Sequence, residues 1–139
     1  MKKEEYTTTF ISGLTVLVFS VGMLYATVFL IPGMLEAYYN EVFRSSSWKT
    51  DWLFYAHPFV LTIALKWVWN RNRNLFKGSV LVQALTLGIT YTLIALVPVM
   101  ILTFSAIEIS LLMVITWILY GFAQATVAGV VFAFRSKKP

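Results

Sequence analysis

The stretch SVLVQALTLGITYTLIALVPVMILTF, residues 79–104, contains no charged residue. A helix needs about 20 predominantly apolar residues to cross the hydrocarbon core of a bilayer. Residues 10–35 and 109–134 are likewise uncharged and as long. The sequence therefore predicts membrane-spanning helices over residues 9–31, 79–104 and 106–134, the last one starting with a capping box at Ser105–Glu108.

A fourth span is predicted over residues 52–69. It is shorter and contains His57, Pro58 and Lys66. Tryptophans concentrate at the membrane–water interface and bracket this segment on both sides: Trp48, Trp52, Trp67 and Trp69. We expect Lys66 to extend its ammonium group towards the nearby headgroups, and the alternative is a buried functional amine.

Composition supports a membrane protein throughout. Of the 139 residues 59% are hydrophobic and 12% are charged, whereas soluble domains average about a quarter charged residues. The connections between spans are short, which favours antiparallel neighbours. The predicted fold class is an all-α integral membrane protein, an antiparallel four-helix bundle that forms a single transmembrane domain over residues 1–139.

The net charge of +5 follows from how the basic residues are placed. Eight of the 11 lysines and arginines precede the first span, follow the last one, or lie in the loop 70–79. Because cytoplasmic segments carry the excess of lysine and arginine, both termini are predicted to be cytoplasmic. These basic residues are expected to contact the lipid bilayer through anionic lipid headgroups at the cytoplasmic face, so the charge indicates no nucleic-acid partner.

The segment after the first span is predicted to be an amphipathic outer extension over residues 33–44. Apolar side chains recur at helical spacing on one side of it, and Glu36 and Glu41 lie on the other. Such a helix lies in the outer interface or extends the first span beyond the bilayer. Both alternatives stay open.

The sequence lacks the residues that several kinds of functional site require. There is no cysteine and His57 is the sole histidine, so cysteine sites and metal sites built on several histidines are excluded. All acidic residues lie outside the predicted hydrocarbon, whereas proton-coupled carriers commonly need an embedded carboxylate. We predict no catalytic residue, no metal and no cofactor.

Polar side chains at membrane depth are costly and often functional, so they define the candidate site. We predict that they line one ligand-binding cavity: Tyr25, His57, Gln83, Tyr91, Tyr120, Gln124 and, at its outer mouth, Glu36. The alternative is that the glutamines form hydrogen bonds between helices and that His57 bonds a tyrosine or a backbone carbonyl. Pro58 is expected to bias His57 away from helical geometry.

Small residues four apart allow helices to approach closely in lipid. Two such groups predict helix packing, one on the first span and one on the fourth: Gly22, Ala26, Gly121, Ala125 and Gly129. The packing is expected within the bundle, and a homo-oligomer contact is the alternative.

The ending from Tyr120 to Arg135 resembles small bacterial membrane proteins of uncharacterised activity. The resemblance implies a bacterial cytoplasmic membrane and carries no functional residues. From the residues we expect a non-enzymatic bundle that binds a lipid, a hydrophobic small molecule or a membrane partner. The first alternative is a subunit of an oligomeric small transporter or channel. The second is a membrane-embedded enzyme using His57 with Glu36 or Tyr55.

Overall fold

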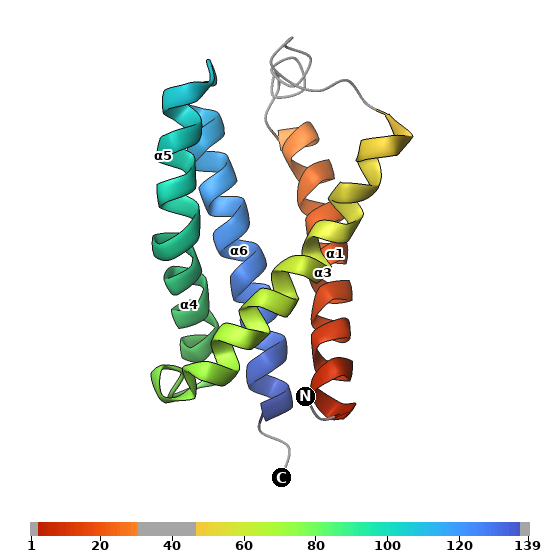
Figure 1. The fold of residues 1–139 in the computed structure, drawn as a ribbon, viewed down its shortest axis with the longest axis vertical. Helices are drawn as coiled ribbons and strands as arrows, with labels where there is room; N and C mark the ends of the chain where they lie inside the picture. The colour runs from red at the N-terminus through yellow and green to blue at the C-terminus, as the bar shows by residue number, and fades with distance from the viewer. Residues whose placement is uncertain (1–2, 31–46, 137–139) are drawn as a thin grey trace.

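A computed structural model describes residues 3–30 and 47–136, all of whose regular structure is helical (Figure 1). The elements are α1 (Lys3–Leu30), α3 (Trp48–Arg71), the 3-10 turn η1 (Arg73–Leu75), α4 (Val80–Tyr91), the π-helical turn η2 (Thr92–Leu96), α5 (Val97–Ala106) and α6 (Leu111–Ser136). Since α4, η2 and α5 follow one another without a break, the described residues form four long helices. The predicted amphipathic segment 33–44, with Glu36, lies outside the described residues.

Three of these helices are long and apolar enough to cross a membrane: Glu4–Leu30, Val80–Ala106 and Leu111–Ser136. This confirms the prediction of a membrane protein built from transmembrane helices. The fourth helix, α3, has 24 residues, and its length of about 36 Å is sufficient to span. It is less apolar, because its sequence includes Lys66, Asn70 and Arg71, and its membrane crossing stays a prediction.

Two local features differ from expectation. The helix α3 continues through His57 and Pro58, so His57 is helical and the expected bias away from helical geometry is not observed. The hydroxyl of Thr62 donates to the carbonyl oxygens of Pro58 and Phe59, at 2.9 and 3.1 Å, and so supports the turn after the proline. The last helix starts at Leu111, where the Ser110 hydroxyl accepts a hydrogen bond from the Met113 N–H at 3.2 Å. Ser110 thus replaces the predicted capping box.

Successive helices alternate in direction, and both ends of the chain lie at one end of the molecule, hereafter the terminal end (Figure 1). The helix α6 packs between α1 and α4, and α3 packs mainly on α1. Figure 1 shows α3 crossing the other helices obliquely. A regular four-helix bundle therefore stays a prediction with respect to α3.

The hydrophobic core lies towards the terminal end, where Phe132 and Trp69 are buried with Leu65 and Leu87. Small residues allow the close approach of α4 and α6 there: a Cβ added at Gly129 would lie 2.8 Å from the Cα of Ala84. Further from the termini, the turn η2 and Pro98 interrupt the regular α-helix. Such interruptions bend helices, and the packing is looser beyond them.

Candidate functional site

The most deeply buried polar side chain predicted to bind a ligand, Gln124, forms a hydrogen bond between helices. Its Nε2 donates to the Ser20 Oγ at 2.8 Å, and Ser20 in turn donates to the Val16 carbonyl oxygen at 2.6 Å. Gln124 is 2% exposed and Ser20 is 1% exposed. The bond joins α6 to α1, which is the structural alternative expected for this glutamine.

Most hydroxyl groups in the spans are satisfied within their own helix. Thr86, Thr90 and Thr116 each donate to the carbonyl oxygen four residues earlier, at 2.7–2.8 Å. Such local bonds leave a hydroxyl donor unavailable to a ligand. The threonine faces of α4 and α6 consequently add no donors to a shared cavity.

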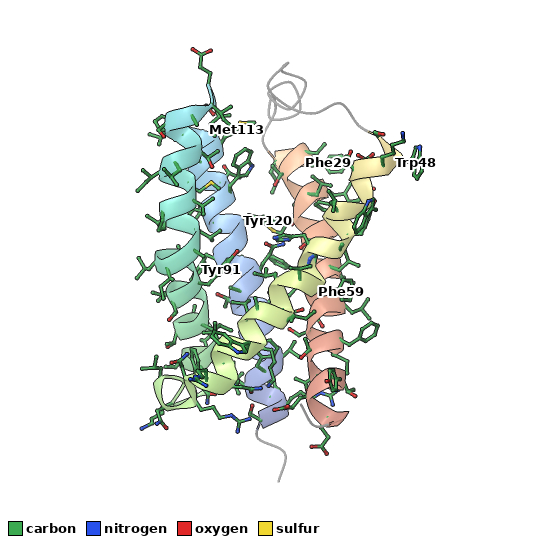
Figure 2. All side chains as sticks on the ribbon, viewed as in Figure 1. Phe29, Trp48, Phe59, Tyr91, Met113 and Tyr120 are labelled. Atoms are coloured by element: carbon green, nitrogen blue, oxygen red, sulfur yellow. The ribbon has the colours of Figure 1, made fainter. Side chains whose placement is uncertain are left out.

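The remaining predicted cavity residues are dispersed over the described part of the chain. Tyr25 is 62% exposed, and His57 is exposed and forms no hydrogen bond with a described residue. Tyr91 and Tyr120 are half-buried near the middle of the molecule (Figure 2). Gln83 lies at the terminal end, where its Nε2 donates to the Gly78 carbonyl oxygen at 2.8 Å.

The predicted packing residues fall into two groups. Gly121 and Gly129 are buried on α6, with Leu96 and Ala84 as their neighbours, and Ala125 is fully buried between them. On α1, Gly22 is exposed, and a Cβ added there would meet no described atom within 4 Å. The α6 residues therefore lie in contacts within the molecule, and Gly22 does not.

Lys66 is buried at the terminal end, near the exposed Arg73 and the half-buried Glu5. Lys66 is only 5% exposed, and its ammonium nitrogen lies 5.0 Å from the centre of the Phe132 ring. Arg73 is close enough for its charge to act on Lys66, and Glu5 acts with opposite sign. The Glu5 carboxylate accepts a hydrogen bond from the Asn70 Nδ2 at 3.2 Å. The expectation that Lys66 reaches the headgroups is thus wrong, because its side chain is buried within the terminal end.

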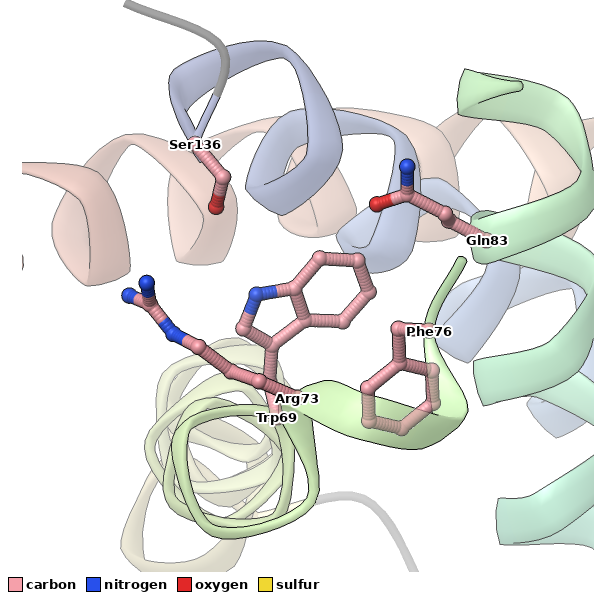
Figure 3. A pocket seen from close by; sticks show the side chains of 5 residues that line it. All are labelled: Trp69, Arg73, Phe76, Gln83 and Ser136. Atoms are coloured by element: carbon pink, nitrogen blue, oxygen red, sulfur yellow. The ribbon is translucent and has the colours of Figure 1, made fainter. Parts of the chain in front are cut away.

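A hollow of about 80 Å³ opens beside this cluster and is here called the terminal hollow (Figure 3). Its lining comes from α3, the following turn, α4 and α6: Trp69, Arg73, Phe76, Gln83 and Ser136. The Trp69 and Phe76 rings stack with centroids 4.6 Å apart. Figure 3 shows the indole nitrogen of Trp69 on the side that faces Arg73 and Ser136.

A second hollow, of about 180 Å³, lies between α5 and α6 away from the termini and is here called the apolar hollow. All its lining side chains are apolar: Val97, Met100, Ile101, Phe104, Leu111, Val114 and Ile118. It adjoins the contact in which Leu96 packs closely against Gly121. The hollow therefore lies beyond the close contact of η2 with α6, where α5 and α6 still pack against each other and Met113 and Val114 are buried.

Neither hollow was among the sites predicted from the sequence. The apolar hollow has no sequence signal, because its residues match those of any lipid-facing helix surface. The terminal hollow had partial signals in Arg73, within the basic loop, and in Trp69, for which an interfacial position is predicted. Among the predicted cavity residues only Gln83 lines it.

No protein-family model matches the chain, and no curated protein or solved structure matches it either. The described residues contain no group of three or more histidines, cysteines, aspartates or glutamates that could hold a metal ion. The features of the molecule that bear on its function are therefore the two hollows and the surfaces.

Proposed function

We propose that this chain is a non-enzymatic membrane protein that binds a hydrophobic molecule, such as a lipid acyl chain, in the apolar hollow. The observation that carries the proposal is a space of about 180 Å³ lined only by apolar side chains. Cavities of about 150 Å³ with similar lining bind benzene or xenon. A ligand there gains apolar contacts and needs no hydrogen bond.

The position of the hollow also supports this function. It lies between the ends of two helices that are apolar enough to span the membrane. A hydrophobic ligand dissolved in the bilayer would reach it without passing through water. Gln124, the buried amide expected to contact a ligand, is bonded to Ser20 and is not required.

The first test fills the hollow. Val114 lines it and is 7% exposed, so the Val114→Trp substitution places a large ring in the space. Leu112, on the same helix, is 57% exposed and outside the hollow, and Leu112→Trp is the matched control. We expect Val114→Trp to abolish retention of co-purified or photoreactive hydrophobic ligands in native mass spectra, with Leu112→Trp unchanged. Equal retention by the unaltered chain and both variants would refute this assignment.

A second candidate is a subunit of an oligomeric transporter or channel, which the face of α1 around Gly22 favours. Gly22 lies between exposed Val18 and Tyr25, and Phe29 continues the same exposed face. A small residue on such a face allows a second helix to approach closely in lipid. Since the chain has no cysteine, Gly22→Cys can be crosslinked without a background.

The crosslinking test separates the two candidates. An oligomer through this face should give a disulfide-linked dimer with Gly22→Cys and none with Leu24→Cys, which points to another side of α1. If both variants remain monomeric, the oligomer candidate is rejected, and the proposal of ligand binding is not affected by this result. The enzyme alternative gains no supporting contact, since His57 has no hydrogen-bonding partner among the described residues.

A further inference from the structure

We propose that the terminal hollow binds the phosphate group of an anionic lipid headgroup. This site is distinct from the apolar hollow and lies at the opposite end of the molecule, which is predicted to be the cytoplasmic side. The hollow of about 80 Å³ is several times larger than the roughly 10–15 Å³ that one water molecule needs. A group of a few heavy atoms therefore fits.

The first argument is an unused donor. Trp69 is 2% exposed, and its indole N–H donates no hydrogen bond to any described residue. The nitrogen itself is not among the fully buried unpartnered polar atoms of the described residues, so it remains accessible from the hollow. Tryptophan side chains commonly place this N–H against an acceptor. In Figure 3 this nitrogen is directed into the hollow, between Arg73 and Ser136. An oxyanion oxygen placed there would accept a hydrogen bond from it.

The second argument is the arrangement of the other polar groups. The guanidinium of Arg73 and the hydroxyl of Ser136 border the same hollow and add further donors. Guanidinium groups match phosphate oxygens in geometry as well as charge. The side-chain oxygen of Gln83 faces the hollow while its nitrogen is held by Gly78. This oxygen would accept a hydrogen bond from a headgroup hydroxyl, as in phosphatidylglycerol.

The third argument is the local charge. Lys66 and Arg73 repel each other, and the nearby Glu5 carboxylate is engaged by Asn70. Arg73 borders the hollow and Lys66 does not line it, so the two cations act on each other beside the hollow. The Glu5 carboxylate near them has a hydrogen-bond donor of its own. An anion in the hollow would relieve the repulsion between Lys66 and Arg73.

The partial negative charges at two helix ends oppose the binding of an anion, but their effect is smaller than that of Arg73. The hollow lies at the C-terminal ends of α3 and α6, whose unpaired carbonyl groups carry partial negative charge. Each helix end is equivalent to about half an elementary charge and is screened by water. The full charge of Arg73, with directed N–H groups, outweighs it, and the N-terminal end of α4 near Gln83 adds positive charge.

The test measures binding of short-chain phosphatidylglycerol to the purified full chain by native mass spectrometry. Arg73→Gln should weaken binding by about tenfold or more, since a charged hydrogen bond is lost. Arg71 is exposed in the same region and does not line the hollow. Arg71→Gln removes the same charge and should cost at most about fivefold, the general attraction of a basic residue to an anionic surface.

Two variants keep the net charge and isolate the donors. Trp69→Phe retains the ring that stacks on Phe76 and removes the N–H, and we expect binding about two- to tenfold weaker. Ser136→Ala changes an exposed residue at the end of α6, so folding is not at risk, and it should weaken binding by a similar factor. Circular dichroism and thermal melts establish that each variant is folded.

The source of the phosphate is resolved by competition. Inorganic phosphate and glycerol phosphate should fail to displace the lipid if a membrane headgroup is the ligand, and displacement would overturn the lipid assignment in favour of a soluble phosphate. Equal losses for Arg73→Gln and Arg71→Gln, with no loss for Trp69→Phe and Ser136→Ala, would overturn the site itself. Val114→Trp should leave this binding unchanged, so the two proposed sites can fail separately.

Discussion

The bond between Gln124 and Ser20 is a polar contact, deep in the molecule, between two helices that are long and apolar enough to span a membrane. In lipid a side-chain amide has no water to replace a missing partner. The pair therefore fixes how α6 lies along α1, because sliding either helix by one turn would leave the amide unpaired.

At this scale we predict that Gln124→Leu lowers the free energy of unfolding by about 0.6–2 kcal/mol, the range for hydrogen bonds between membrane helices. Ser20→Ala should have a similar effect. The double variant should cost less than the sum of the two, since both changes remove one bond. Unfolding in mixed detergent measures these energies, and strict additivity would show that the bond contributes nothing.

At the scale of the elements, the contact of α4 with α6 depends on glycines that are close to a neighbouring helix. A Cβ at Gly129 would meet the Ala84 Cα at 2.8 Å, and backbone atoms move only if a whole helix moves. Gly22 offers the matched comparison, since a Cβ there meets no described atom within 4 Å.

We therefore expect Gly129→Ala to destabilise the protein by about 1–3 kcal/mol, as overpacking does. Gly22→Ala should not destabilise it, because alanine favours the helix and has space. The same unfolding measurement compares the two. Equal stability of both variants would contradict the close approach of α4 and α6.

The helices themselves were largely predictable from the sequence, because a long uncharged segment in a membrane satisfies its backbone hydrogen bonds by forming a helix. Their ends were less so: the first helix begins at Lys3, well before the predicted span, since charged residues can continue a helix into water. The π-helical turn at Thr92–Leu96 has no local sequence signal apart from Pro98. Its Leu96 packs beside Gly121 of α6, a contact between segments far apart in the sequence.

The candidate site was predictable only in part. Depth in the membrane identified Gln124 correctly as a buried residue, yet its partner Ser20 is an ordinary serine in an apolar run. Tyr25 is predicted near mid-membrane and His57 nearer the outer interface, and both side chains are exposed. Depth does not predict this exposure, because contacts with neighbouring helices determine which way each helix is rotated about its axis. The two hollows arise from the spacing between helices, which a single sequence does not encode locally.

At the scale of the whole molecule, both termini lie at one end and the helices alternate in direction (Figure 1). The helix α3 therefore returns the chain to the terminal side. The chain contains no cysteine, so single introduced cysteines report the side of the membrane directly.

We predict that Asn74→Cys reacts with a membrane-impermeant thiol reagent only from the side of the termini. Lys49→Cys and Glu108→Cys should react only from the opposite side, as all three positions are exposed and lie near the ends of helices. The measurement compares the extent of labelling in intact cells, where only the outer side is accessible, with that in opened vesicles, where both sides are. Labelling of Lys49→Cys and Asn74→Cys from one side would show that α3 does not cross.

The π-helical turn has a consequence for how this chain tolerates changes in length. Val97 donates to the carbonyl oxygen of Thr92, five positions back rather than four, so the turn holds one residue more than an α-helix would. Removing a single residue there would restore an α-helix and rotate all of α5 by about 100° about its axis. Met100 and Phe104 would then swing away from α6 without any change in their identity. The one additional residue in the π-helical turn thus sets the rotation of α5 about its axis, and this rotation determines which side chains border the apolar hollow.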